Sequence, residues 1–152
     1  FMSNKYINIY NNLVNLTRNK ELYKYLSKED TFSDRLLIFL FHFAFFLKTF
    51  KKSSDKKTLQ NIFDFIFRQL EVSIREIGYG DASINKKMKS YVNTFYDILS
   101  KIEGWSNMSK LEKNEILNNY LSLDNEPNDL VDYFDNYMLK LSNSTLNSFI
   151  NV

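Results

Sequence analysis

Apolar residues recur at intervals of three and four positions along most of this chain. The pattern is clearest between residues 55 and 77, in a stripe formed by Leu59, Ile62, Phe63, Ile66, Phe67, Leu70, Ile74 and Ile77. This spacing gathers apolar side chains on one face of a helix, whereas the alternation that marks strands is scarce. The periodicity predicts helices at 4–18, 32–51, 55–77, 84–102, 110–121 and 126–142. A short helix is predicted at 20–26, and one more short turn after residue 142.

Side chains that cap helices stand at several of these predicted starts. Thr31 is followed by Asp34 in the capping-box position, and Ser109 is followed in the same way by Glu112. Asn125 precedes a Glu-Pro pair, which is a helix-start signal. The pattern as a whole predicts an all-α fold, a single compact domain of about six to seven helices spanning residues 1–152.

A Gly-x-Gly-Asp sequence separates the helices predicted at 55–77 and 84–102. Gly78 follows the last apolar residue of the first helix, where a positive φ is wanted, and Gly80 continues the turn. Asp81 or Ser83 can cap the second helix. The sequence is no phosphate loop, because it follows a helix and lacks the Lys-Ser/Thr ending.

Residues 32–51 are apolar nearly all round, so we expect other helices to surround them. The apolar run at 36–47 is too short for a membrane span, which needs about 20 residues. It therefore predicts a buried core helix, with a core cluster of Phe39, Phe41, Phe43, Phe45, Phe46 and Phe50. Facing stripes of the next two helices add Phe63, Ile66, Phe67, Leu70, Phe95 and Leu99 to the predicted core.

Composition narrows the class of protein. The chain has 152 residues, 44% of them hydrophobic, which suffices for a sizeable core. Its lack of cysteine excludes disulfides, thiol catalysis and cysteine-based zinc sites. A net charge of +2, without a sustained basic block, does not indicate a nucleic-acid partner. The densest basic patch, residues 51–57, is interpreted as a solvated connector, with contact to a phospholipid or RNA surface as the alternative.

Asp64, Arg68, Glu71 and Arg75 share one face of the helix predicted at 55–77, and we call them the charged stripe. The acid-before-base order at Asp64–Arg68 and Glu71–Arg75 supports a helix, so a solvated face is one interpretation. A polar contact surface for a partner is the other. Glu71 and Glu76 could be imagined as a catalytic pair, but nothing else in the chain supplies an enzyme site around them. The sequence therefore predicts no enzyme and no metal site.

His42 is the only histidine and lies seven residues after Arg35, hence on roughly the same helix face. In an apolar helix it is interpreted as a hydrogen-bonded core residue. Haem ligation is the alternative, because one axial histidine can suffice. No CxxCH motif and no second histidine support it.

Two blocks of this sequence resemble the ubiquinol–cytochrome c chaperone family. The first runs from Asp30-Thr31 through Arg35 to His42, with Asp34 in place of the family's Gly. The second is more specific and comprises Phe63-Asp64, Ile74 to Asp81 at the family's Leu-Arg-Glu-Met-Gly-Val-Gly-Asp signature, Lys86 to Lys89, and Phe95-Tyr96. Gln69 and Asp97 depart from the family pattern. Thr17-Arg18 before Tyr23 is also consistent with the family.

The resemblance implies an all-α assembly chaperone that binds newly made cytochrome b and supports its haem loading and its assembly into respiratory complex III. It implies partner-binding roles for Asp64, Arg68, Glu71, Arg75, Glu76, Asp81, Lys86, Lys87 and Lys89. Structural motif roles fall on Arg35, His42, Gly78 and Gly80. No cofactor is expected, and the protein is expected to be a monomer that binds no nucleic acid.

With no targeting sequence visible, the expected location is the bacterial cytoplasm at the inner-membrane surface, reached through the client. The mitochondrial matrix is expected instead if the source is eukaryotic. Two other functions stay open on the residues alone: a haem- or small-ligand-binding protein using His42, and a helical protein–protein adaptor.

Overall fold

The computed structural model describes residues 4–26, 32–121, 123 and 129–152, and these parts are helical, without a β-strand. The α-helices are α1 (Ile7–Thr17), α2 (Phe32–Phe50), α3 (Lys56–Glu76), α4 (Asp81–Lys101), α5 (Lys110–Tyr120), α6 (Asp129–Ser142) and α7 (Leu146–Ile150). Two 3-10 turns, η1 (Lys20–Tyr25) and η2 (Trp105–Asn107), lie between them. The predicted all-α class is confirmed, and the tail after residue 142 forms a full short helix.

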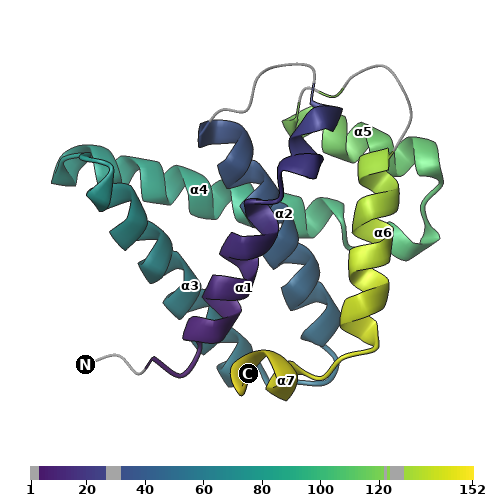
Figure 1. The fold of residues 1–152 in the computed structure, drawn as a ribbon, viewed down its shortest axis with the longest axis horizontal. Coiled ribbons are helices and arrows are strands. Elements are labelled where there is room, and N and C mark those ends of the chain that lie inside the picture. Colours follow the sequence, from purple (N-terminus) through teal and green to yellow (C-terminus); the bar gives the residue numbers. More distant parts are fainter. Residues whose placement is uncertain (1–3, 27–31, 122, 124–128) are drawn as a thin grey trace.

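Helix α2 runs through the centre of the molecule, with α1, α4 and α6 packed around it (Figure 1). Its buried residues include every phenylalanine of the predicted core cluster, together with His42. A helix that is apolar nearly all round can bury its surface only when neighbours cover each side. The sequence prediction for this element is therefore confirmed.

Helices α3 and α4 form a V whose tip stands away from the rest of the molecule (Figure 1). Phenylalanine rings fill the angle of the V: Phe67 lies 5.4 Å from Phe95, and Phe43 of α2 stacks on Phe95 at 5.0 Å. Ile66 and Leu70 are buried, as predicted. Phe63 and Leu99 are only half-buried, because they lie where α3 and α4 have begun to diverge.

Capping side chains define several helix starts. Asp55 accepts a hydrogen bond from the Thr58 amide at the start of α3. The predicted capping box at Ser109 and Glu112 is present at the start of α5.

The cap predicted at Asp81 or Ser83 is wrong. Helix α4 already begins at Asp81, and Gly80 is its N-cap without a side-chain bond. The extended backbone of Gly80, with φ −77° and ψ 164°, turns the chain directly into the helix, so no capping side chain is used. The caps predicted at Thr31 and Asn125 lie outside the described residues.

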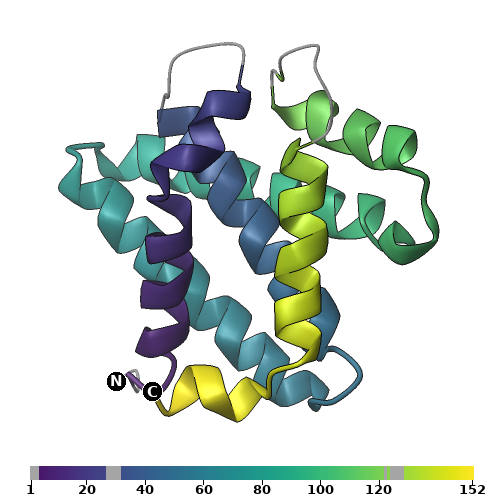
Figure 2. The same cartoon turned by 45° about the vertical axis from the view of Figure 1, so that its right-hand side comes forward.

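Helices α1 and α6 run antiparallel on either side of α2 (Figure 2). Each packs on α2, and α7 lies across the lower ends, against α1. Asn8 Nδ2 donates a 2.9 Å hydrogen bond to the carbonyl of Ile150, which ties α1 to α7. Residues of α1, α6 and α7 and of the segments next to them line a groove between α1 and α6.

Candidate functional site

The charged stripe lies on the outer side of α3. Asp64, Arg68 and Arg75 are exposed and Glu71 is half-buried. Arg75 Nε lies 3.7 Å from Glu71 Oε2, so the predicted Glu71–Arg75 pair is present. Asp64 instead accepts a 2.9 Å hydrogen bond from Gln60. The stripe is thus solvent-facing, and the core does not use it.

One exposed ion pair bridges the turn at the tip of the V. Arg75 NH1 donates to Asp81 Oδ1, joining the end of α3 to the start of α4. This bond raises the pKa of the Arg75 guanidinium above its ordinary value. Gly78 has φ 109°, as the sequence predicted, and a Cβ there would meet nothing within 4 Å. The glycine is therefore required by backbone conformation and not by space.

Apolar side chains lie exposed beside these charges. Val72, Ile77 and Tyr79 are 44%, 61% and 40% exposed, and Lys87 Nζ lies 4.6 Å from the centre of the Tyr79 ring. Exposed apolar groups rimmed by polar ones mark contact surfaces more often than scattered single residues do. The tip of the V thus combines charge with accessible apolar area.

A shallow groove follows the stripe between α3, α4 and the start of α1. Asp64, Arg68 and Glu71 line one side of it. Its apolar lining consists of Tyr6, Phe63, Phe65, Phe67, Val72, Met88 and Val92. Such an amphipathic groove suits an apolar helix or segment that also carries charge.

The remaining predicted contact residues are less closely grouped. Glu76, Lys86 and Lys89 are exposed and Lys87 is half-buried. In the part of the chain that the structure describes, no ion pair links these residues to the charged stripe. Arg35 is exposed in the first turn of α2, whereas His42 is fully buried in the same helix.

His42 is enclosed, and both ring nitrogens are engaged. Nδ1 lies 2.8 Å from the carbonyl of Ile38 and must donate, because a carbonyl only accepts. Nε2 lies 2.6 Å from the Tyr133 hydroxyl and therefore accepts from it. Burial without a charged partner lowers the pKa of His42 to about 4. The geometry is that of a neutral core histidine, and the lone pair that haem iron would need is already used.

The sequence did not point to Tyr133, because it lies 91 positions away from His42. The spacing of Tyr133 and Tyr137 on one face of α6 was the only available signal. Among the residues that can be described, no group of three or more His, Cys, Asp or Glu side chains could hold a metal.

The sequence model of the ubiquinol-cytochrome C chaperone family matches residues 24–119, more than half of the chain. This chain belongs to the ubiquinol–cytochrome c chaperone family. The match runs from η1 to α5, so it covers α2, the V and the charged stripe. Neither the search of curated proteins nor that of solved structures gives a match.

Membership of this family supports a chaperone role in complex III assembly, with a client protein as partner. Families of chaperones are typically non-catalytic. Across the described helices, none is both long enough and apolar enough to cross a bilayer. Helices α1, α6 and α7 lie outside the matched residues.

Proposed function

We propose that the protein binds newly made cytochrome b through the charged stripe and its apolar neighbours, and supports haem loading and assembly of complex III. The observation that carries this proposal is the position of the family signature. Arg75, Glu76 and Asp81 are exposed at the tip of the V, although they belong to the most specific part of the resemblance. Exposed charges contribute little to stability, so a contact role explains their placement better than a folding role does.

The client's chemistry fits this surface. Loops of a membrane protein on the side where it is made are enriched in Lys and Arg. Glu71, Glu76 and Asp81 offer carboxylates to such loops, while Val72 and Ile77 offer accessible apolar area to a client helix. Lys86, Lys87 and Lys89 extend the proposed contact along α4.

The proposed setting follows from the same client. The protein acts as a monomer and a single domain, in the bacterial cytoplasm at the inner-membrane surface or in the mitochondrial matrix. It contacts the membrane through cytochrome b. The competing proposal of a haem protein built on His42 is disfavoured, because Tyr133 and Ile38 occupy both ring nitrogens.

Crosslinked capture from native membranes tests the proposal. The tagged double variant Arg68→Glu/Glu71→Arg keeps the net charge, exchanges the two charges in the middle of the stripe, and leaves the Arg75–Asp81 pair in place. We expect it to fold with a nearly unchanged melting temperature and to capture cytochrome b several-fold less well than the unaltered protein.

A matched control comes from Glu21 and Lys24, an exposed pair at 2.7 Å on η1. Glu21→Lys/Lys24→Glu makes the same exchange away from the V and should capture cytochrome b normally. Normal capture by the stripe variant, or an equal loss in the control, would show that the stripe does not contact the client.

A further inference from the structure

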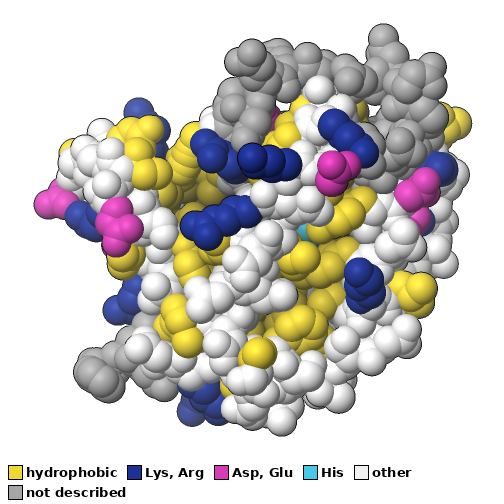
Figure 3. Space-filling model, in the orientation of Figure 1, with side chains coloured by type: hydrophobic (Ala, Val, Ile, Leu, Met, Phe, Trp, Pro, Cys, Tyr) yellow, Lys and Arg dark blue, Asp and Glu magenta, His cyan; other side chains and the backbone are white. Residues whose placement is uncertain are grey.

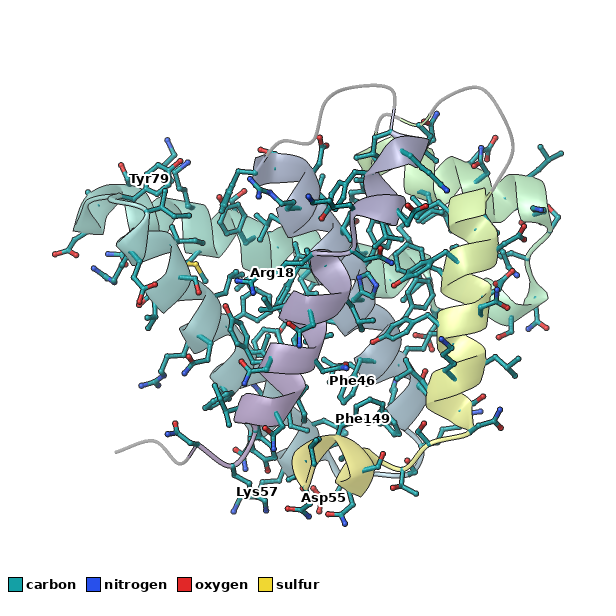
Figure 4. All side chains as sticks on the ribbon, in the orientation of Figure 1. Arg18, Phe46, Asp55, Lys57, Tyr79 and Phe149 are labelled. Carbon is teal, nitrogen blue, oxygen red and sulfur yellow. The ribbon has the colours of Figure 1, made fainter. Side chains whose placement is uncertain are left out.

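The groove between α1 and α6 is a second concave surface, outside the residues matched by the family. We call it the amide groove. Its walls come from α1, α6 and α7, and its lining residues are Asn12, Leu16, Asn19, Tyr133, Asn136, Tyr137, Lys140, Leu141, Asn143, Ser144 and Phe149. Figure 3 shows apolar side chains at the bottom of this hollow, with polar atoms along its sides. Figure 4 places Phe149 at its lower end, beside Phe46.

Asparagines on the two walls are spaced alike. Asn12 lies in α1 and Asn136 in α6, whereas Asn19 and Asn143 lie just beyond the ends of these helices, and each pair is seven positions apart. Seven helical residues rise about 10 Å, close to the length of three residues in an extended chain. A side-chain amide carries both donors and an acceptor, as a backbone peptide unit does. Asn136 and Asn143 can therefore each pair with both the N–H and the C=O of a polypeptide backbone. Asn19 offers chiefly its NH2 group, because its Oδ1 already accepts a hydrogen bond from the Glu21 amide.

Two buried polar atoms at this groove lack a partner. Tyr137 is only 7% exposed, and its hydroxyl makes no hydrogen bond; the same holds for Oδ1 of Asn12. Buried polar groups are nearly always hydrogen-bonded, and an unpaired one costs free energy. These atoms belong to opposite walls, and a rotation of each side chain toward the groove would let a single occupant satisfy both.

The charges at the groove further limit the kinds of segment that it can bind. Lys140 is the only charged residue of the lining, and it lies exposed at the edge. Leu16, Leu141 and Phe149 add apolar surface. The lining suits an uncharged or acidic segment and offers no carboxylate to a basic one. The charged stripe differs, because it offers two carboxylates together with two guanidinium groups.

We infer that the amide groove binds an extended, unfolded polypeptide segment by its backbone. Backbone recognition tolerates many sequences, which is what holding an incompletely folded chain requires. The inference deepens the proposed chaperone role and rests on it only for the source of the segment. The groove and the charged stripe would then hold different parts of one client.

Fluorescence anisotropy with a synthetic probe tests this. The probe is a fluorescein-labelled nonapeptide of Leu, Ala and Ser with an amidated end, and its partner probe carries N-methyl groups on alternate backbone nitrogens. We expect the unmethylated peptide to bind at least roughly tenfold more tightly, because methylation removes donors and keeps the side chains. Equal binding of the two probes, or binding of neither, would overturn the inference.

Variants of the protein sharpen the test. Asn136→Ala/Asn143→Ala should weaken binding of the peptide roughly tenfold, as expected for the loss of about two hydrogen bonds. The control Asn85→Ala/Asn93→Ala alters two exposed asparagines of α4 and should bind normally. Unchanged binding in the groove variant would contradict backbone recognition.

Tyr137→Phe separates binding from folding. It removes a hydroxyl that makes no bond in the free protein, so the melting temperature should stay the same or rise while peptide affinity falls about threefold or more. A lower melting temperature with unchanged affinity would assign the hydroxyl to the fold. Because the assay needs no cytochrome b, its failure leaves the stripe proposal standing, and the stripe variant should still bind the peptide.

Discussion

Two concave surfaces of this protein, the groove beside the charged stripe and the amide groove, differ in chemistry although both are walled by amphipathic helices. The groove beside the charged stripe, on α3 and α4, lies within the family match except for Lys5 and Tyr6, and exposes carboxylates, guanidinium groups and apolar side chains. The amide groove, on α1 and α6, lies outside that match and is lined mainly by neutral amides and phenols. Charged side chains can distinguish one client from another, whereas amide side chains can bind the backbone that all polypeptides share. Under the two proposals made above, this difference corresponds to a division between choosing a client and holding it.

The largest expected effect concerns the packing that sets the angle of the V. Phe67→Ala removes a ring that contacts Phe43, Phe63 and Phe95, and it should cost about 3–5 kcal/mol of unfolding free energy. Denaturant melts measure this loss. Tyr96→Ala is the comparison. It removes a half-exposed ring of α4 that stacks on Phe63, and it should cost far less. A loss under about 1 kcal/mol for Phe67→Ala would mean that the V is not held by this core.

A fall in pH should lower the stability of the protein through His42, which is packed beneath α6 on the other side of the molecule. Because the folded-state pKa of about 4 lies below the ordinary 6.5, the unfolded chain binds the proton first as pH falls. Stability is therefore complete above pH 6.5 and declines down to about pH 4, by roughly 3 kcal/mol in all. The groups that face the ring are Ile38, Tyr133, Phe134 and Tyr137, and none of them is charged at these pH values.

Denaturant melts at pH 7 and pH 5 check this, with His42→Gln as the reference. The variant starts less stable but should lose less stability than the unaltered protein over that interval, since glutamine does not titrate. Equal losses in both proteins would place the acid sensitivity in other groups.

A smaller effect is expected at the tip of the V. Gly78→Val forces a β-branched residue to φ 109° and should destabilise by about 1–3 kcal/mol. Gly80→Ala is the matched change, because φ is −77° there and space is open, so it should be nearly neutral. Thermal melts compare the two variants. Equal behaviour would mean that the turn does not depend on positive φ.

Much of the fold could be predicted because it follows from local pattern. The apolar period located every long helix to within a few residues, and Gly78 and Ser109 marked real boundaries. The start of α4 was missed because Gly80 caps it with its backbone alone, which leaves no side-chain signal. The facing stripes of α3 and α4 were predicted to form one continuous core. The two helices diverge, however, and Phe63 and Leu99 are only half-buried.

The site was less predictable, because its decisive contacts join distant positions. Nothing near His42 in the sequence showed that its ring would accept a hydrogen bond from Tyr133, 91 positions away. The asparagines of the amide groove read as ordinary polar positions of two separate helices. Only the packing of both helices on α2 brings them face to face. The charged stripe, in contrast, lies within one helix and could be predicted from spacing alone.

Site-specific photocrosslinking in native membranes tests most directly whether the charged stripe and the amide groove contact different parts of one client. A benzoylphenylalanine replaces Arg68 on the stripe, Asn136 in the amide groove, or Asn93 as a surface control. The account predicts crosslinks to cytochrome b at both 68 and 136, at different segments of that client, and none at 93. The account would be contradicted if position 68 gave no crosslink to cytochrome b, or if position 93 gave crosslinks as often as positions 68 and 136 do.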